Sequence, residues 1–259
     1  MEIAKTSFSY RKVESMEEIS QEDNLCLLDL KNADPTQYEM GKSSAYAGRA
    51  TAEMLLKAME ILKNKQADGM CFAPLNKGNI KLAGYHYESE HALFSEHLGT
   101  HVSEINYVQE LWSSRVTSHV PLREVCNHLT KEGITESILL LSSTMEKAGV
   151  ERKIAVAALN PHAGEHGLCG DEEETLIIPA IEQAEKFGVK VMAMEPADVV
   201  FRKAVDGIYN GIVTMYHDQG QVALKLRDYR HAVTIAAGDI PPITTPAHGT
   251  AYDLSLIHI

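Results

Sequence analysis

Three histidines of the sequence follow apolar segments that have the length and composition of buried strands. His162 lies in LNPHAGE after KIAVAAL, His217 lies in MYHDQG after GIVT, and His248 lies in ITTPAHGTA, downstream of HAVTIAAGD. In open α/β sheets, ligands bind in the crevice outside the carboxyl ends of the strands. Three neutral imidazoles that converge there would suit a divalent metal ion such as zinc and would leave coordination positions open for a substrate. The placement therefore predicts a metal site.

Each histidine taken alone also has a simpler interpretation. The chain has 12 histidines, and a histidine on a loop is often a surface residue or a helix cap. His162 and His166 have a spacing that would place two ligands on one helix face. Pro161 and the neighbouring glycines argue against a helix there, so His166 is given no role. Asp218 and Glu165 are candidates to hydrogen-bond the second ring nitrogen of a ligating histidine.

The elements that must position these histidines alternate between strand and helix. In the second half, the patterns predict strands at 153–159, 190–194, 211–216 and 231–238, and helices at 172–188 and 221–226. In the first half, they predict strands at 25–30 and 69–75, and helices at 43–65, 91–100 and 136–150. The acidic run at 171–174 is expected to stabilise the dipole of the helix that it opens. This alternation favours an α/β fold with a mainly parallel sheet.

Composition narrows the class of protein. A formal net charge of −12 argues against a nucleic-acid partner, because phosphate-binding surfaces are basic. The four cysteines form no CxxC pair and indicate reduced thiols of a cytoplasmic protein. No run approaches the roughly 20 apolar residues that a membrane span needs. GKSS (41–44) lacks the earlier glycine of a P-loop, since Thr36 occupies that position, and no strand is followed by GxGxxG.

The histidine stretches, PAD (196–198), Lys225 after MYHDQG, and HGTA together resemble the 4-hydroxythreonine-4-phosphate dehydrogenase family of vitamin B6 (pyridoxine) biosynthesis. APLNKG (73–78) and VTSHVPL (116–122) extend the resemblance over about residues 43–253. It implies a two-domain α/β fold similar to isocitrate and isopropylmalate dehydrogenases, which binds NAD without the Rossmann glycine fingerprint.

The resemblance also implies a homodimer whose metal site lies at the interface, with both subunits contributing. The metal-ligand histidines of the family fall on His162, His217 and His248. The cofactors implied are NAD and a divalent metal ion, zinc in the first place, with magnesium, cobalt or manganese as alternatives.

The reaction implied is the NAD-dependent oxidation of a secondary alcohol in a small hydroxy acid, assisted by the metal and followed by decarboxylation. A general base must take the hydroxyl proton, and Asp218 and Lys225 are the candidates. Asp218 can instead merely orient His217, and Lys225 can be a surface lysine. His119 is a candidate substrate-binding residue or, alternatively, a turn histidine before proline. Two other functions stay open: a metal-dependent hydrolase or lyase that uses the same histidines, or an inactive fragment.

The sequence departs from the family pattern at the substrate. Where biosynthetic members have GHTE, this chain has SEHALF (89–94), so Glu90 and His91 take the positions of a substrate-binding His-Thr pair. The change argues against a phosphorylated threonine as substrate. LWSSRVTSHVPL and QGQVALKL are more similar to relatives that include the cis-dihydrodiol carboxylate dehydrogenases of terephthalate breakdown.

The two ends of the chain also depart from the family. The glycine-rich N-terminal segment and the region beyond HGTAYD are missing. We therefore expect residues 1–253 to form an incomplete dehydrogenase unit of two interleaved α/β subdomains that share a crevice. LSLIHI (254–259) matches the translation of a common sequencing adapter and is expected to be a non-native tail, with a native apolar terminal strand as the alternative.

Overall fold

The computed structural model describes residues 7–247 and 249, apart from residues 21, 40 and 88. His248 and the predicted tail 254–259 thus lie outside the described residues. The chain divides into two compact units, of which the second is His101–Ala247 and the first contains Met1–Thr100.

The first unit is built around helix α1 (Ala45–Lys63), which begins where the Ser44 hydroxyl accepts a hydrogen bond from the amide of Ala47. A Cβ atom at Gly48 would lie 1.9 Å from the carbonyl oxygen of Asn79, so the close contact between α1 and α2 requires glycine. The remaining elements are β1 (Arg11–Val13), β2 (Cys26–Leu28), β3 (Met70–Cys71), α2 (Lys77–Leu82), α3 (Glu90–Leu98) and 3-10 turns at Met16–Glu18 and Pro35–Gln37.

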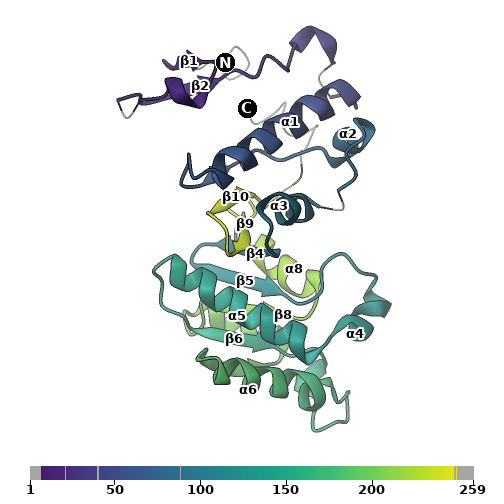
Figure 1. Ribbon diagram of the computed structural model, residues 1–259. Coiled ribbons are helices and arrows are strands. Elements are labelled where there is room, and N and C mark those ends of the chain that lie inside the picture. Colours follow the sequence, from purple (N-terminus) through teal and green to yellow (C-terminus); the bar gives the residue numbers. More distant parts are fainter. Residues whose placement is uncertain (1–6, 21, 40, 88, 248, 250–259) are drawn as a thin grey trace. The chain divides into compact units, whose positions relative to one another are not determined.

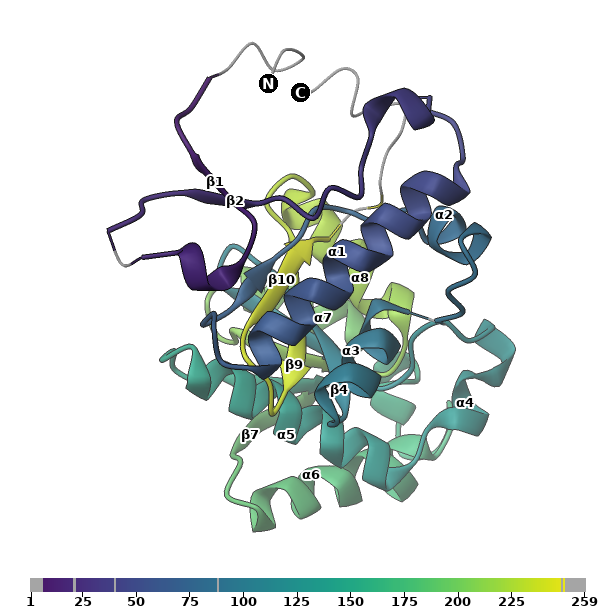
Figure 2. The same cartoon turned by 45° about the horizontal axis from the view of Figure 1, so that its top comes forward.

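The second unit contains a twisted mixed sheet with the strand order β10-β9-β4-β5-β8-β6-β7 (Figures 1 and 2). Strands β5, β8, β6 and β7 pair in parallel, and β10, β9, β4 and β5 pair antiparallel. The strands are β4 (Val102–Val108), β5 (Leu111–Arg115), β6 (Ile154–Ala157), β7 (Val191–Glu195), β8 (Gly211–Thr214), β9 (Val233–Gly238) and β10 (Ile243–Pro246).

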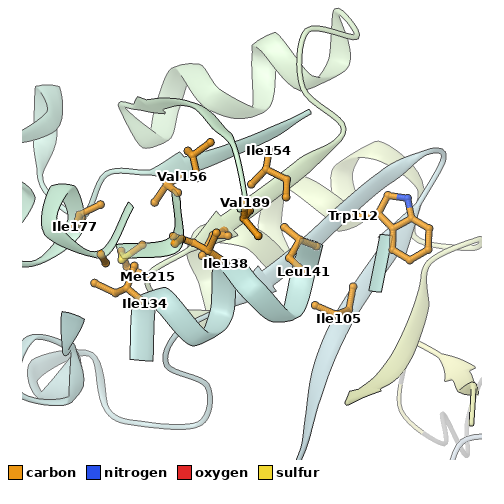
Figure 3. Close-up of a cluster of buried hydrophobic side chains, with 14 of the residues drawn as sticks. Ile105, Trp112, Ile134, Ile138, Leu141, Ile154, Val156, Ile177, Val189 and Met215 are labelled. Atoms are coloured by element: carbon orange, nitrogen blue, oxygen red, sulfur yellow. The ribbon is translucent and has the colours of Figure 1, made fainter. Parts of the chain in front are cut away.

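Helices cover both faces of this sheet. Alternate residues of β6 point to opposite faces: Ile154 and Val156 pack with α5 and α6, whereas Ala155 and Ala157 pack with α7. Figure 3 shows the first of these two cores, with Ile138 and Leu141 of α5 lying against strand residues. The helices are α4 (Val125–His128), α5 (Lys131–Lys147), α6 (Ile178–Lys186), α7 (Ala197–Val205) and α8 (His217–Asp228), with 3-10 turns at Leu122–Glu124 and Pro161–Gly164 and a π-helical turn at Glu173–Ile177.

The predicted α/β architecture is confirmed, and the parallel strands β6, β7 and β8 lie where strands were predicted. The patterns did not predict helix α7 or the strands β4, β5 and β10. These three strands make up most of the antiparallel half of the sheet. Helix α8 begins at His217, four residues before the predicted start. The four cysteines, all within the described residues, are unpaired. Among those residues, no helix is both long and apolar enough to cross a membrane.

Candidate functional site

The carboxyl ends of β6 and β8 form a switch point in the parallel part of the sheet. The chain leaves β6 toward α6 on one face and leaves β8 toward α8 on the opposite face, although the two strands are neighbours. Strands whose connections leave in opposite directions open a crevice between their ends, where ligands bind in folds of this kind. His162 follows β6 and His217 follows β8, so the structure places both at this switch point.

The turn after β6 is held by a buried carboxylate. The Glu173 side chain, in a residue 1% exposed, accepts hydrogen bonds from the amides of Leu159 (2.9 Å) and Asn160 (2.7 Å) and from the side-chain amide of Asn160 (3.0 Å). Glu172 accepts from the same side-chain amide at 2.6 Å. Backbone amide hydrogen bonds and this contact lower the pKa of Glu172 from its ordinary value. The acidic run therefore fixes the His162 turn as well as opening a helix.

The backbone of this turn is strained. Four non-glycine residues have left-handed φ angles: His162 (54°), Ala163 (55°), Glu165 (44°) and His166 (57°). Such conformations cost about 1–3 kcal/mol each and persist where surrounding contacts impose them, commonly at functional sites. Gly164 (φ 79°) is required here, because a Cβ atom would lie 2.8 Å from the buried Glu173 carboxylate. The result is an exposed His162 on a turn of fixed shape.

The start of α8 is tied to both neighbouring strand ends. The Gln219 side chain accepts a hydrogen bond from the amide of Met215 (2.7 Å) and donates one to the carbonyl oxygen of Ala158 (2.7 Å), just beyond β6. His217 opens the helix, and its Nδ1 lies 2.6 Å from a carboxylate oxygen of Asp218. This contact leaves Nε2 of His217 as the nitrogen that can bind a ligand.

His119 lies beside His217. The turn that follows β5 carries His119, whose ring centroid is 5.5 Å from that of His217. Thr117 secures this turn to the end of β8, because both its amide and its hydroxyl donate to the carbonyl oxygen of Met215 (3.1 and 2.8 Å). The structure therefore brings His119, His217 and Asp218 together.

Other predicted residues lie elsewhere. Lys225 is exposed on α8, eight residues after His217, which corresponds to about 12 Å along the helix axis. Glu90 and His91 belong to the first unit, in the first turn of α3. The Glu90 carboxylate forms an ion pair with Lys77 (2.8 Å), and the His91 ring contacts that of Phe94 edge-on.

The chemistry of the donor set suits a divalent metal, but the described residues do not complete a site. No group of three metal-ligating side chains gathers among them, and His248 lies outside that part of the chain. The Asp218 carboxylate at Nδ1 of His217 is the kind of partner that metal-bound imidazoles have. The residues present are thus compatible with a metal bound by His162 and His217 together with a third ligand.

The sequence patterns did not identify Glu173 or Gln219 as residues that hold the site. A signal for Glu173 did exist, since it shares a helical period with the buried residues Ile177, Ala180 and Ala184. A carboxylate on the apolar face of a helix must find hydrogen-bond donors, and here they are the amides of the His162 turn.

Comparison with known proteins assigns the family. The family model described as "Pyridoxal phosphate biosynthetic protein PdxA" matches residues 1–257, so the chain belongs to this family. A protein of Pasteurella multocida (strain Pm70), provisionally named a 4-hydroxythreonine-4-phosphate dehydrogenase, is 40% identical over 261 residues, which are 98% of this chain and 77% of the relative.

Two further relatives agree. A provisionally named D-threonate 4-phosphate dehydrogenase of Clostridium botulinum (strain Hall / ATCC 3502 / NCTC 13319 / Type A) is 37% identical over 233 residues, covering 88% of this chain and 69% of the relative. The crystal structure of 4-hydroxythreonine-4-phosphate dehydrogenase from Klebsiella pneumoniae superposes with a TM-score of 0.82 at 32% identity, covering 95% of this chain and 76% of that one. The family resemblance expected from the motifs is confirmed, and these relatives are named as oxidoreductases.

Proposed function

We propose that this chain is an NAD-dependent dehydrogenase that oxidises a secondary alcohol of a small phosphorylated hydroxy acid and then releases carbon dioxide from the product. The observation that carries the proposal is the switch point, where His162 and His217 follow adjacent parallel strands. Membership of a family whose relatives are named dehydrogenases supports the reaction class.

The metal proposal rests on His162, His217 and His248. A divalent ion bound there would lower the pKa of the substrate hydroxyl and stabilise charge on the product oxygen. Within the chain, Asp218 orients the His217 ring, Gln219 fixes the first turn of α8, and Glu173 fixes the turn of His162. These contacts hold the two imidazoles before any ligand binds, which reduces the cost of ordering the site.

The two substrates named for the relatives share a phosphate ester, a carboxyl group and a secondary hydroxyl. Oxidation of a hydroxyl β to a carboxylate yields a β-keto acid, whose loss of carbon dioxide is chemically easy, and this is why decarboxylation is part of the proposal. The Glu90–His91 pair, which stands where a substrate-binding His-Thr pair is expected, argues against simple transfer of the 4-hydroxythreonine 4-phosphate substrate. D-threonate 4-phosphate, 4-hydroxythreonine 4-phosphate and a cis-dihydrodiol carboxylate are therefore the substrates to compare.

Proton transfer is assigned to side chains near His217. Asp218 (side chain 79% exposed) contacts the His217 ring and is the candidate base within one subunit. His119, beside His217, is proposed to contact the substrate. Lys225 is proposed to act in the site of a second subunit, since it is exposed and lies about 12 Å along α8 from His217.

A homodimer is part of the proposal, and α8 supplies support for it. Val222 (56% exposed), Leu226 (82%) and Tyr229 (46%) recur at helical spacing and form an apolar stripe on the outer face of α8. Two copies of this helix packed antiparallel through their exposed stripes would set Val222 of one copy against Leu226 of the other, and Asp218 against Arg230. Opposite charges at both ends of such a contact favour this pairing.

The test is NAD reduction by the purified chain with each of the three substrates, after chelation and after addition of Zn²⁺, Mn²⁺ or Mg²⁺. We expect reduction with a phosphorylated substrate only when a metal is restored. Turnover that survives chelation would contradict the metal proposal. A thermal-shift measurement separates the alternative reaction class: stabilisation by NAD supports a dehydrogenase, whereas stabilisation by metal but not by NAD favours a hydrolase or lyase.

A further inference from the structure

A buried polar network lies at the carboxyl end of β5, and its centre is the guanidinium group of Arg115. The Arg115 side chain is 7% exposed and forms an ion pair with Glu104 of β4 (2.6 Å; side chain 21% exposed). The same guanidinium donates to Asn106 Oδ1 (2.8 Å) and, through Nε, to the Ser118 hydroxyl (2.8 Å). The planar group thus directs its donors toward three side chains, two on β4 and one in the turn after β5, which only arginine can do in a fixed geometry.

The Nε–H group of Arg115 donates to the turn that carries His119. Ser118 immediately precedes His119, and its hydroxyl accepts the Arg115 hydrogen bond at 2.8 Å. Thr117, one residue earlier, fixes the same turn to Met215. The backbone that carries His119 is therefore held by the contacts of the two residues that precede it.

A second N–H group of Arg115 is connected, through Asn106, to the helix that carries His217. Asn106 Oδ1 accepts from Arg115 and also from the side-chain amide of Gln221 (2.5 Å). Gln221, 9% exposed, lies four residues after His217 and therefore on the same face of α8. The side-chain amide of Asn106 also donates to Glu104 (2.9 Å) and to Thr234 (3.0 Å), which keeps its orientation fixed.

From these contacts we propose that Arg115 is a positioning residue that anchors both His119 and His217 to one buried guanidinium, through Ser118 and through Asn106–Gln221. The assignment of the two histidines to catalysis rests on the proposed function, whereas their anchoring does not. Misplacement of a catalytic group by about 1 Å can cost roughly 100-fold in rate. A side chain that sets the separation of two site histidines accordingly controls turnover without touching the substrate.

The hydrogen-bonded connection from Arg115 to each histidine is called an arm: the His119 arm runs through Ser118, and the His217 arm runs through Asn106 and Gln221. The test uses variants that remove one arm at a time. Ser118→Ala removes the His119 arm, Ser118→Thr restores the hydroxyl, and Gln221→Leu removes the His217 arm. The double variant Arg115→Met with Glu104→Met removes both charges together, because a buried ion pair replaced by apolar residues is often neutral for stability, whereas a lone buried charge is not. Arg227→Met is the matched control, since Arg227 lies on the same helix and contacts the Gln109 carbonyl oxygen (2.8 Å) at the β4–β5 turn.

Two measurements are made on each folded variant: kcat and KM for NAD reduction, and the imidazole carbon–proton resonances of His119 and His217 in NMR spectra. We expect Ser118→Ala to shift the His119 resonance and lower kcat about 10- to 100-fold with little change in KM, and Ser118→Thr to restore both. Gln221→Leu should shift His217 more than His119, the double variant should shift both, and Arg227→Met neither.

Ring resonances that stay at their wild-type positions in Ser118→Ala and Gln221→Leu would overturn the proposal, even if the double variant fails to fold. Equal shifts in Arg227→Met would also overturn it, because they would indicate general loosening. If the wild-type chain reduces no NAD with any substrate, the proposed function fails, but the resonances still decide whether Arg115 positions the two rings.

Discussion

Helix α8 has a histidine–aspartate pair at each end, and the distance from imidazole nitrogen to carboxylate oxygen is the same in both pairs. At its start, Nδ1 of His217 lies 2.6 Å from the Asp218 carboxylate. Just beyond its end, Nδ1 of His231 lies 2.6 Å from the Asp228 carboxylate. The distance between imidazole and carboxylate therefore does not distinguish a functional pair from a structural one.

The two pairs differ in which of the two side chains is the more buried. In the first pair the His217 side chain is 34% exposed and the Asp218 side chain 79% exposed, whereas in the second the values are 76% for His231 and 17% for Asp228. Asp228 also accepts hydrogen bonds from the Gln109 side chain (2.8 Å) and the Arg230 amide (3.0 Å). The second pair thus secures the end of the helix to the β4–β5 turn, while the first holds an imidazole at the switch point.

The largest expected effect is the loss of activity in His217→Ala, and His231→Ala is the matched comparison. His217→Ala should lower NAD reduction by more than about 100-fold, because loss of a proposed ligand exceeds the loss of an outer partner. His231→Ala should leave the rate within about twofold, since it removes an exposed ring far from the switch point. Steady-state rates with the best phosphorylated substrate check both variants. Equal losses in the two would mean that the position of a pair on α8 has no functional meaning.

Strands β6 and β8 of the parallel half were predictable because each is a continuous apolar run buried on both faces. Ile154 to Ala157 and Gly211 to Thr214 are fully buried in this way. Strands β4 and β5 gave no such signal, since Glu104, Asn106 and Arg115 interrupt their apolar pattern. Those polar residues satisfy one another only once β4, β5, β9 and α8 have assembled, so no local pattern reveals them.

The placement of His162 and His217 beyond strand ends was predictable, whereas the side chains that fix their turns were not. The proline and glycines of the His162 turn argued against an α-helix there, which agrees with its left-handed backbone angles. The run Asp171–Glu174 suggested only a helix dipole effect, yet the Glu173 carboxylate is buried against the amides of Leu159 and Asn160. Which acid of a run turns inward depends on the helix phase, and here a π-helical turn sets that phase.

The next effect in size is expected at the exposed aspartate of the first pair. Asp218→Asn keeps one oxygen and the length of the side chain but removes the charge that orients the His217 ring. We expect metal affinity to fall about 10- to 100-fold, as for other outer partners of ligating histidines. Thermal stability should change little, because the carboxylate is mostly in water. Calorimetric titration with Zn²⁺ and a melting curve measure the two quantities. A marked fall in melting temperature with unchanged Zn²⁺ affinity would make this pair structural, like the second.

The smallest effect is expected at the enclosed aspartate of the second pair, and it should appear in stability rather than in activity. The hydrogen bond from His231, followed by those from Gln109 and the backbone, lowers the pKa of Asp228 from 3.8. A carboxyl group with a lowered pKa stabilises the folded state above its unfolded pKa, and this contribution is lost as the pH falls through the folded value. Asp228→Asn should therefore melt a few degrees below the wild type at pH 7, and the difference should narrow as the pH drops below about 4. Melting curves across this pH range measure it, with His231→Ala as the matched variant that removes only the first of these contacts. A difference that stays constant with pH would show that the Asp228 carboxylate is no more stabilised in the fold than in the unfolded chain, and the contrast between the two ends of α8 would then rest on activity alone.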